Sequence, residues 1–226
     1  MNATTARKIN NNRAGRLPAL FKGNKMGMLL LWGILALNLL ISWFNCKTCG
    51  TMWAESKRLG GWIRVLVWCG AIQAAIGFSS VVIFIEVYAA YLTGHLDEKY
   101  AQAAISLWYL GIIIPAIGTG LLITVHSWIV AYRERNWANM GTAAWNTFAS
   151  AHNIYNAANG GVSGAWDSVS KLFKGGDSKD SKQAQLVILL VIISLAAGIL
   201  ITMGLIGHYD RKARLAIATG QRGIAA

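Results

Sequence analysis

Four long blocks of apolar residues constrain this chain more than any other feature. A run of about 20 apolar residues matches the hydrocarbon core of a bilayer. Only 13% of the 226 residues are charged, about half the fraction found in soluble domains. The sequence therefore predicts an all-α fold, a polytopic membrane helical bundle with four transmembrane helices at residues 26–44, 62–93, 103–132 and 184–207.

The remaining segments complete the predicted organisation. The link at residues 94–99 is short, so the second and third transmembrane helices are expected to form an antiparallel hairpin. The chain then divides into a basic N-terminal tail (1–25), transmembrane helices 1 to 3 (26–132), an amphipathic extramembrane helical region (133–183), transmembrane helix 4 (184–207) and a basic C-terminal tail (208–226).

The net charge of +12 indicates contact with membrane lipids. Lys and Arg residues that flank membrane spans bind anionic lipid headgroups, and the chain has no nucleic-acid-binding motif, so no specific nucleic acid is expected. The segment before the first helix is basic and has no acidic residue, which favours a cytoplasmic N-terminus. With four crossings, both termini are expected to be cytoplasmic, in the inner membrane of a bacterium.

Residues 133–183 carry aromatic side chains at helical spacing. Two amphipathic helices are expected there, separated by the glycines at 160 and 161. They are predicted to lie in the membrane interface between spans 3 and 4; alternatively, they pack on the protein itself or on a neighbouring subunit. The candidate interface residues are Trp137, Trp145, Phe148, Tyr155, Trp166 and Phe173.

Three polar residues inside the apolar blocks are candidates for function. Glu86 is the one acid well inside a span, and ionisable groups in a membrane are often functional. As an alternative, Glu86 is near a helix end, is protonated, or bonds to Tyr109 or Ser106 of the third span. A hydrogen bond between Gln73 and His126 is expected to join spans 2 and 3.

Cys46 and Cys49 form a CxxC that follows the first span, outside the membrane in the expected orientation. A CxxC can be a redox pair, a structural disulfide or two free thiols. The placement of Cys46 and Cys49 after the first of four spans resembles the quinone-linked disulfide oxidases of bacterial membranes, and this resemblance implies thiol oxidation. Those enzymes need a second cysteine pair in the later loop, whereas residues 133–183 contain no cysteine.

Small residues recur at spacings of three and four within the spans. Gly70, Ala74 and Gly77 show this spacing, and glycines also recur in the fourth span at 198, 204 and 207. Small residues on one helix face let two helices approach closely. Tight packing within the chain or between copies is therefore expected.

The sequence indicates a non-catalytic protein. It has no His, Cys, Asp and Glu cluster with metal-ligand spacing and no catalytic or phosphate-binding motif, so neither a metal nor a cofactor is expected. The predicted function is a structural or assembly subunit of a larger membrane complex, such as a secretion or conjugation machine, in a homo- or hetero-oligomer with other membrane subunits. The alternatives are a channel or transporter subunit that uses Glu86 and His126, and a thiol-disulfide oxidoreductase that uses Cys46 and Cys49.

Overall fold

The computed structural model describes residues 25–174 and 178–219, and in these residues the regular structure is entirely helical. The elements in chain order are α2 (Lys25–Leu59), α3 (Gly61–Leu92), α4 (Glu98–Glu134), α5 (Trp137–Asn156), the π-helical turn η1 (Ala157–Gly161), α6 (Val162–Ser170), the 3-10 turn η2 (Lys171–Lys174) and α7 (Ser178–Ala218).

Four of these helices, α2, α3, α4 and α7, are long and apolar enough to cross a membrane. This confirms the prediction of a polytopic, all-helical membrane chain. Large apolar side chains such as Leu30 on α2 and Leu200 on α7 are exposed at the surface, as expected for residues that contact lipid.

Two helices continue beyond their predicted ends. α2 passes the expected end at Phe44 and reaches Leu59, because residues 45–59 hold no proline and only one glycine before the Gly60–Gly61 pair. Gly60 has a φ of 93°, a left-handed conformation that ends the helix. α7 continues past Gly207, and its last turns carry an ion pair between Asp210 and Arg214. The predicted C-terminal tail is therefore helical as far as Ala218.

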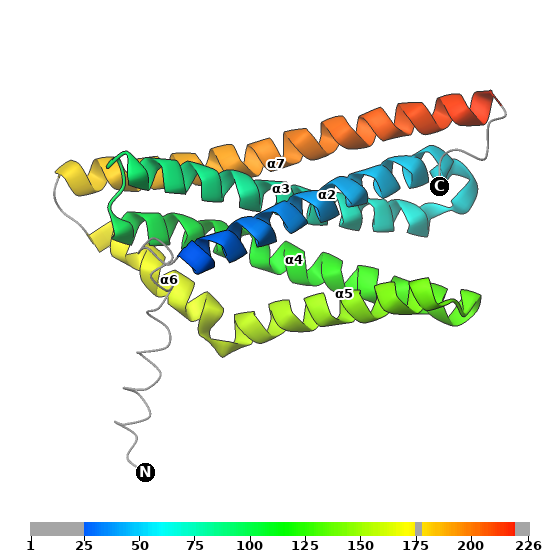
Figure 1. Cartoon of the computed structure of the whole chain (residues 1–226), viewed down its shortest axis with the longest axis horizontal. Helices are drawn as coiled ribbons and strands as arrows, with labels where there is room; N and C mark the ends of the chain where they lie inside the picture. The colour runs from blue at the N-terminus through cyan, green and yellow to red at the C-terminus, as the bar shows by residue number, and fades with distance from the viewer. Residues whose placement is uncertain (1–24, 175–177, 220–226) are drawn as a thin grey trace, which may run out of the picture.

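The packing forms two groups of helices that share α3 and α7. α2, α3 and α7 pack on one another, while α4 packs on α3, α5, α6 and α7 (Figure 1). α3 and α4 form the predicted antiparallel hairpin. Its turn is closed by the backbone N–H groups of His95 and Leu96, which both donate to the carbonyl oxygen of Ala90.

The start of α7 is fastened to the start of α4. Gln183 Nε2 donates to Asp97 Oδ2 at 3.0 Å, and ion pairs join Lys99 to Asp180 and Lys179 to Asp97. The hydrogen bond from Gln183 lowers the pKa of the Asp97 carboxyl group below its usual value, and Lys179 and Lys99 lower it further. We refer to these residues as the clasp.

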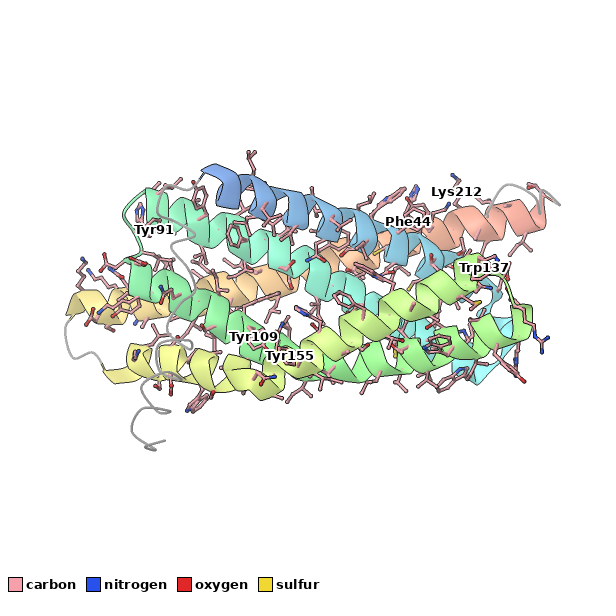
Figure 2. The ribbon with its side chains drawn as sticks, turned by 60° about the horizontal axis from the view of Figure 1, so that its bottom comes forward. Phe44, Tyr91, Tyr109, Trp137, Tyr155 and Lys212 are labelled. Carbon is pink, nitrogen blue, oxygen red and sulfur yellow. The ribbon has the colours of Figure 1, made fainter. Side chains whose placement is uncertain are left out.

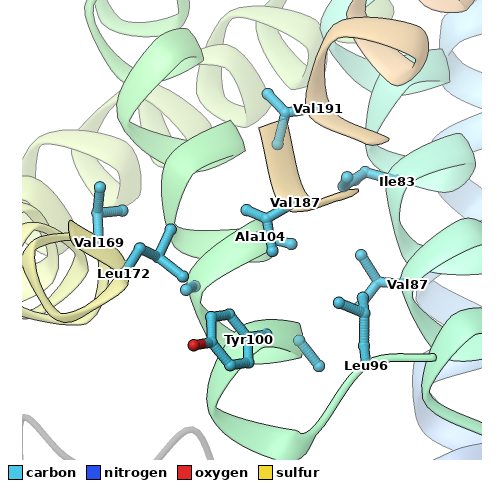
Figure 3. Close-up of a cluster of buried hydrophobic side chains, with 11 residues drawn as sticks. Ile83, Val87, Leu96, Tyr100, Ala104, Val169, Leu172, Val187 and Val191 are labelled. Atoms are coloured by element: carbon cyan, nitrogen blue, oxygen red, sulfur yellow. The ribbon is translucent and has the colours of Figure 1, made fainter. Parts of the chain in front are cut away.

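An apolar cluster lies beside the clasp and joins the α3–α4 link to three helical segments. It contains Leu96, Tyr100, Leu172 and Val187, which come from the α3–α4 link, α4, η2 and α7 (Figure 3). α4 and α7 therefore begin at the same end of the molecule and run in the same direction.

α2 also runs parallel to α7. Cys46 lies next to Thr202, and further along both helices Gly50 lies against Tyr209. The beginning of α2 and the end of α7 consequently lie at opposite ends of the described structure (Figure 1).

Candidate functional site

Glu86 is bonded to α7 and not to α4. Ser194 Oγ donates to Glu86 Oε2 at 2.8 Å, and the Ser194 side chain is fully buried. The bond to Tyr109 or Ser106, one of the alternatives for Glu86, is therefore not the one formed. The difference has a physical cause: α7 packs on α3 beside Glu86, and the long segment before α7 hides this register from sequence inspection.

Gln73 does join α3 to α4, but through different partners from the one predicted. Its Nε2 donates to the carbonyl oxygen of Ala116 at 2.8 Å and to Thr119 Oγ1 at 2.7 Å. The expected bond to His126 is wrong, because a hairpin pairs residues equidistant from its turn at residues 93–97. His126 lies about two helical turns beyond Thr119.

Gln73→Leu is expected to destabilise the protein while His126→Leu is not. Leucine removes both donors of Gln73, and such interhelical bonds in membranes contribute about 0.6 kcal/mol each. We expect a loss of about 1 kcal/mol in the free energy of unfolding by SDS in mixed micelles. His126 makes no side-chain hydrogen bond within the described part of the chain, so its replacement is the matched control. Equal losses for the two variants would contradict this assignment.

The CxxC lies within α2 instead of following it. Cys46 and Cys49 are free thiols that are 0% and 4% exposed. The Cys49 thiol donates to the carbonyl oxygen of Val67 at 3.5 Å and lies against Gly70 of α3. Cys46 faces α7 next to Thr202. Both thiols thus pack between transmembrane helices, and neither lies in an exposed loop.

The aromatic side chains of α5 and α6 point away from the rest of the chain. Trp145, Phe148 and Tyr155 are 53%, 63% and 65% exposed, and Trp137 and Trp166 are 86% and 64% exposed. Figure 2 shows Trp137 near the end of the molecule where α4 ends, and Tyr155 farther along α5. The side chain of Phe173 lies outside the described residues.

The opposite face of α5 is small and polar, and this face contacts α4. Ala143 and Ser150 are buried there. Thr124 Oγ1 of α4 lies 2.9 Å from Ser150 Oγ and donates to the carbonyl oxygen of Asn146. Of the two arrangements left open by the sequence, the structure therefore has α5 packed on the protein itself.

Several hydroxyl groups that join neighbouring helices are not predicted from the sequence. Trp108 Nε1 donates to Ser79 Oγ at 3.0 Å, and Asn38 Nδ2 donates to Ser80 Oγ at 2.9 Å. Ser194 belongs to the same class. The available signal was the presence of single Ser and Thr residues within otherwise apolar spans, because hydroxyl groups in a bilayer must find a partner in the protein.

The described residues contain no group of three or more His, Cys, Asp or Glu side chains that could hold a metal ion. The polar side chains of the spans act chemically as hydrogen-bond ties between helices. No family model matches the chain, and comparisons with curated proteins and with solved structures found no similar protein.

Proposed function

We propose that this chain is a non-catalytic integral membrane subunit with a structural or assembly role in a larger membrane complex, such as a secretion or conjugation machine. The observation that carries the proposal is the use of the polar groups within the spans. They tie each long helix to a neighbour: Asn38 joins α2 to α3, Gln73 joins α3 to α4, and Glu86 joins α3 to α7.

These ties favour a rigid scaffold over a transport path. A channel or carrier needs polar groups that face a water-filled or substrate-filled space. The carboxylate of Glu86 instead accepts a hydrogen bond from the buried Ser194. The thiol-exchange alternative needs an accessible sulfur atom, whereas Cys46 and Cys49 are buried between helices.

The contact surface for other subunits is, in this proposal, the aromatic face of α5 and α6. Aromatic residues are enriched at protein interfaces, and a contiguous exposed patch of them indicates a binding surface. The face is formed by Trp137, Trp145, Phe148, Tyr155 and Trp166.

Photo-crosslinking in native membranes tests this proposal. A photoreactive benzoylphenylalanine replaces Trp145 on α5, and in a matched control it replaces Leu200, which is exposed on α7. We expect an adduct with a second membrane protein, identified by mass spectrometry, from position 145 and none from position 200. A chain that gives no adduct at position 145 and purifies from mild detergent as a lone monomer would count against an assembly role.

A further inference from the structure

We propose that the segment from α5 to η2 is a fifth membrane crossing, and that the beginning of α2 and the end of α7 therefore lie on opposite sides of the membrane. α4 ends at one end of the molecule, whereas the clasp holds the beginning of α7 at the other end. The chain between Arg135 and Ser178 must consequently travel the full length of α4.

This return follows the surface of α4 closely, in antiparallel register. Asn139 Nδ2 donates to Glu134 Oε2 near the end of α4, and Trp128 Nε1 donates to Thr147 Oγ1. Ser150 then meets Thr124. Farther along, Gly161 lies against Tyr109, and Leu172 reaches the cluster that holds Tyr100. The segment thus covers α4, a candidate membrane span, from one end to the other.

The polarity of α5 is that of a helix in lipid. In water, the apolar face of an amphipathic helix packs on the protein and its polar face is exposed. Here Ala143 and Ser150 face α4, while Trp145, Phe148 and Tyr155 face outward. Residues 136–166 also contain no Asp, Glu, Lys or Arg. The outward face is therefore suited to the acyl chains of the bilayer.

Several polar side chains along the segment form hydrogen bonds within it. Thr142 Oγ1 and Thr147 Oγ1 donate to backbone carbonyl oxygens one turn earlier. Asn156 Nδ2 lies 2.8 Å from His152 Nε2, and Asn159 Nδ2 donates to the carbonyl oxygen of Tyr155. A bilayer offers no water to replace such partners, so internal bonding is the condition for entering it.

The irregular turn η1 can also lie within the membrane. Asn159 and Gly160 leave helical geometry there, and Gly160 has a φ of 90°, which a residue with a side chain rarely adopts. Non-helical backbone is tolerated in a membrane where protein covers it. Gly160 and Gly161 are half-buried, and the Tyr109 hydroxyl of α4 lies against Gly161, so α4 covers one side of this turn.

Five crossings change the side of the membrane on which α7 ends. α2 and α7 both begin at the clasp end, so an odd number of crossings separates residue 25 from residue 218. This replaces the expectation that both termini are cytoplasmic, which depended on four crossings. The inference does not depend on the proposed function, although any protein that covers the aromatic face must then lie in the membrane.

Cysteine labelling at four exposed positions tests the topology. Glu98→Cys, Arg133→Cys, Lys182→Cys and Thr219→Cys are each made in the full chain and treated in intact spheroplasts with a membrane-impermeant maleimide. Five crossings predict that positions 98 and 182 react from one side and positions 133 and 219 from the other. Four crossings predict that positions 98 and 219 react from one side and positions 133 and 182 from the other. This result would overturn the inference. The unsubstituted chain, whose three cysteines are buried, gives the background.

A second measurement tests the contact with acyl chains. Phe148→Cys is labelled with bimane and reconstituted in phosphatidylcholine vesicles whose acyl chains carry bromine. We expect strong quenching at position 148 and weak quenching at the matched control, Arg133→Cys. Quenching by aqueous iodide would show a surface location, and protection from both quenchers would show cover by a second copy. Either outcome would overturn the proposed lipid contact, independently of the crosslinking result.

Discussion

Gly198→Ala is expected to lower the free energy of unfolding by about 1–3 kcal/mol, the usual cost of overpacking a well-packed interior. A Cβ atom at Gly198 meets the carbonyl oxygen of Ala75 and lies 2.8 Å from Ser79 Cβ and 2.9 Å from the Ser79 backbone nitrogen. These atoms belong largely to the α3 backbone, which cannot move aside as a flexible side chain can. The added methyl group must therefore push α7 away from α3.

SDS titration in mixed micelles, followed by tryptophan fluorescence, measures this loss. Gly204→Ala is the matched control, because it makes the same chemical change on the same helix where no atom lies within 4 Å. Alanine is favoured over glycine in a helix by about 0.5–1 kcal/mol, so Gly204→Ala should be neutral or slightly stabilising. Similar effects at both positions would show that α7 does not pack on α3 through Gly198.

Ser194→Ala is expected to cost about 1–3 kcal/mol, because it leaves the Glu86 carboxyl group without its partner inside the membrane. Glu86→Gln should cost less, since the amide oxygen still accepts the hydrogen bond from Ser194. A double-mutant cycle with Glu86→Leu isolates the pair. The double variant removes both polar groups and should be more stable than the two single losses added together.

The same unfolding assay applies to the cycle. Additive losses from Ser194→Ala and Glu86→Leu would show that the two side chains do not interact. A loss from Glu86→Gln as large as that from Ser194→Ala would show that the negative charge itself, and not the hydrogen bond, stabilises the fold.

The sequence was sufficient for the four long apolar helices but not for their mutual register. Hydropathy identifies a span because it depends on composition over about 20 residues. The partner of Gln73 depends on counting residues from the hairpin turn, and the count leads to Thr119 and not to His126. The partner of Glu86 depends on where α7 begins in space, and that position is set by the clasp at Asp97, which the sequence pattern does not reveal.

The aromatic periodicity of residues 137–155 predicted a helix correctly, but it could not say which face meets the protein. The same pattern fits a helix in water with Trp145 inward and a helix in lipid with Trp145 outward. The small and polar residues between the aromatic ones, such as Ala143 and Ser150, carried the missing information. Ala143 and Ser150 are seven residues, or two helical turns, apart, so they share one face and allow a close helix contact, here with α4.

The clasp also sets an order of events during synthesis. Asp97 and Gln183 are 86 residues apart, so the contact can form only after the ribosome has passed α5 and α6 and has begun α7. Until then the α3–α4 hairpin is already made, and the carboxyl group of Glu86 has no Ser194 to meet it. α7, the last long helix to be synthesised, therefore supplies the hydrogen-bond partner of Glu86, which entered the membrane earlier as part of α3. A nascent chain arrested before α7 should expose that acid to quality-control proteases.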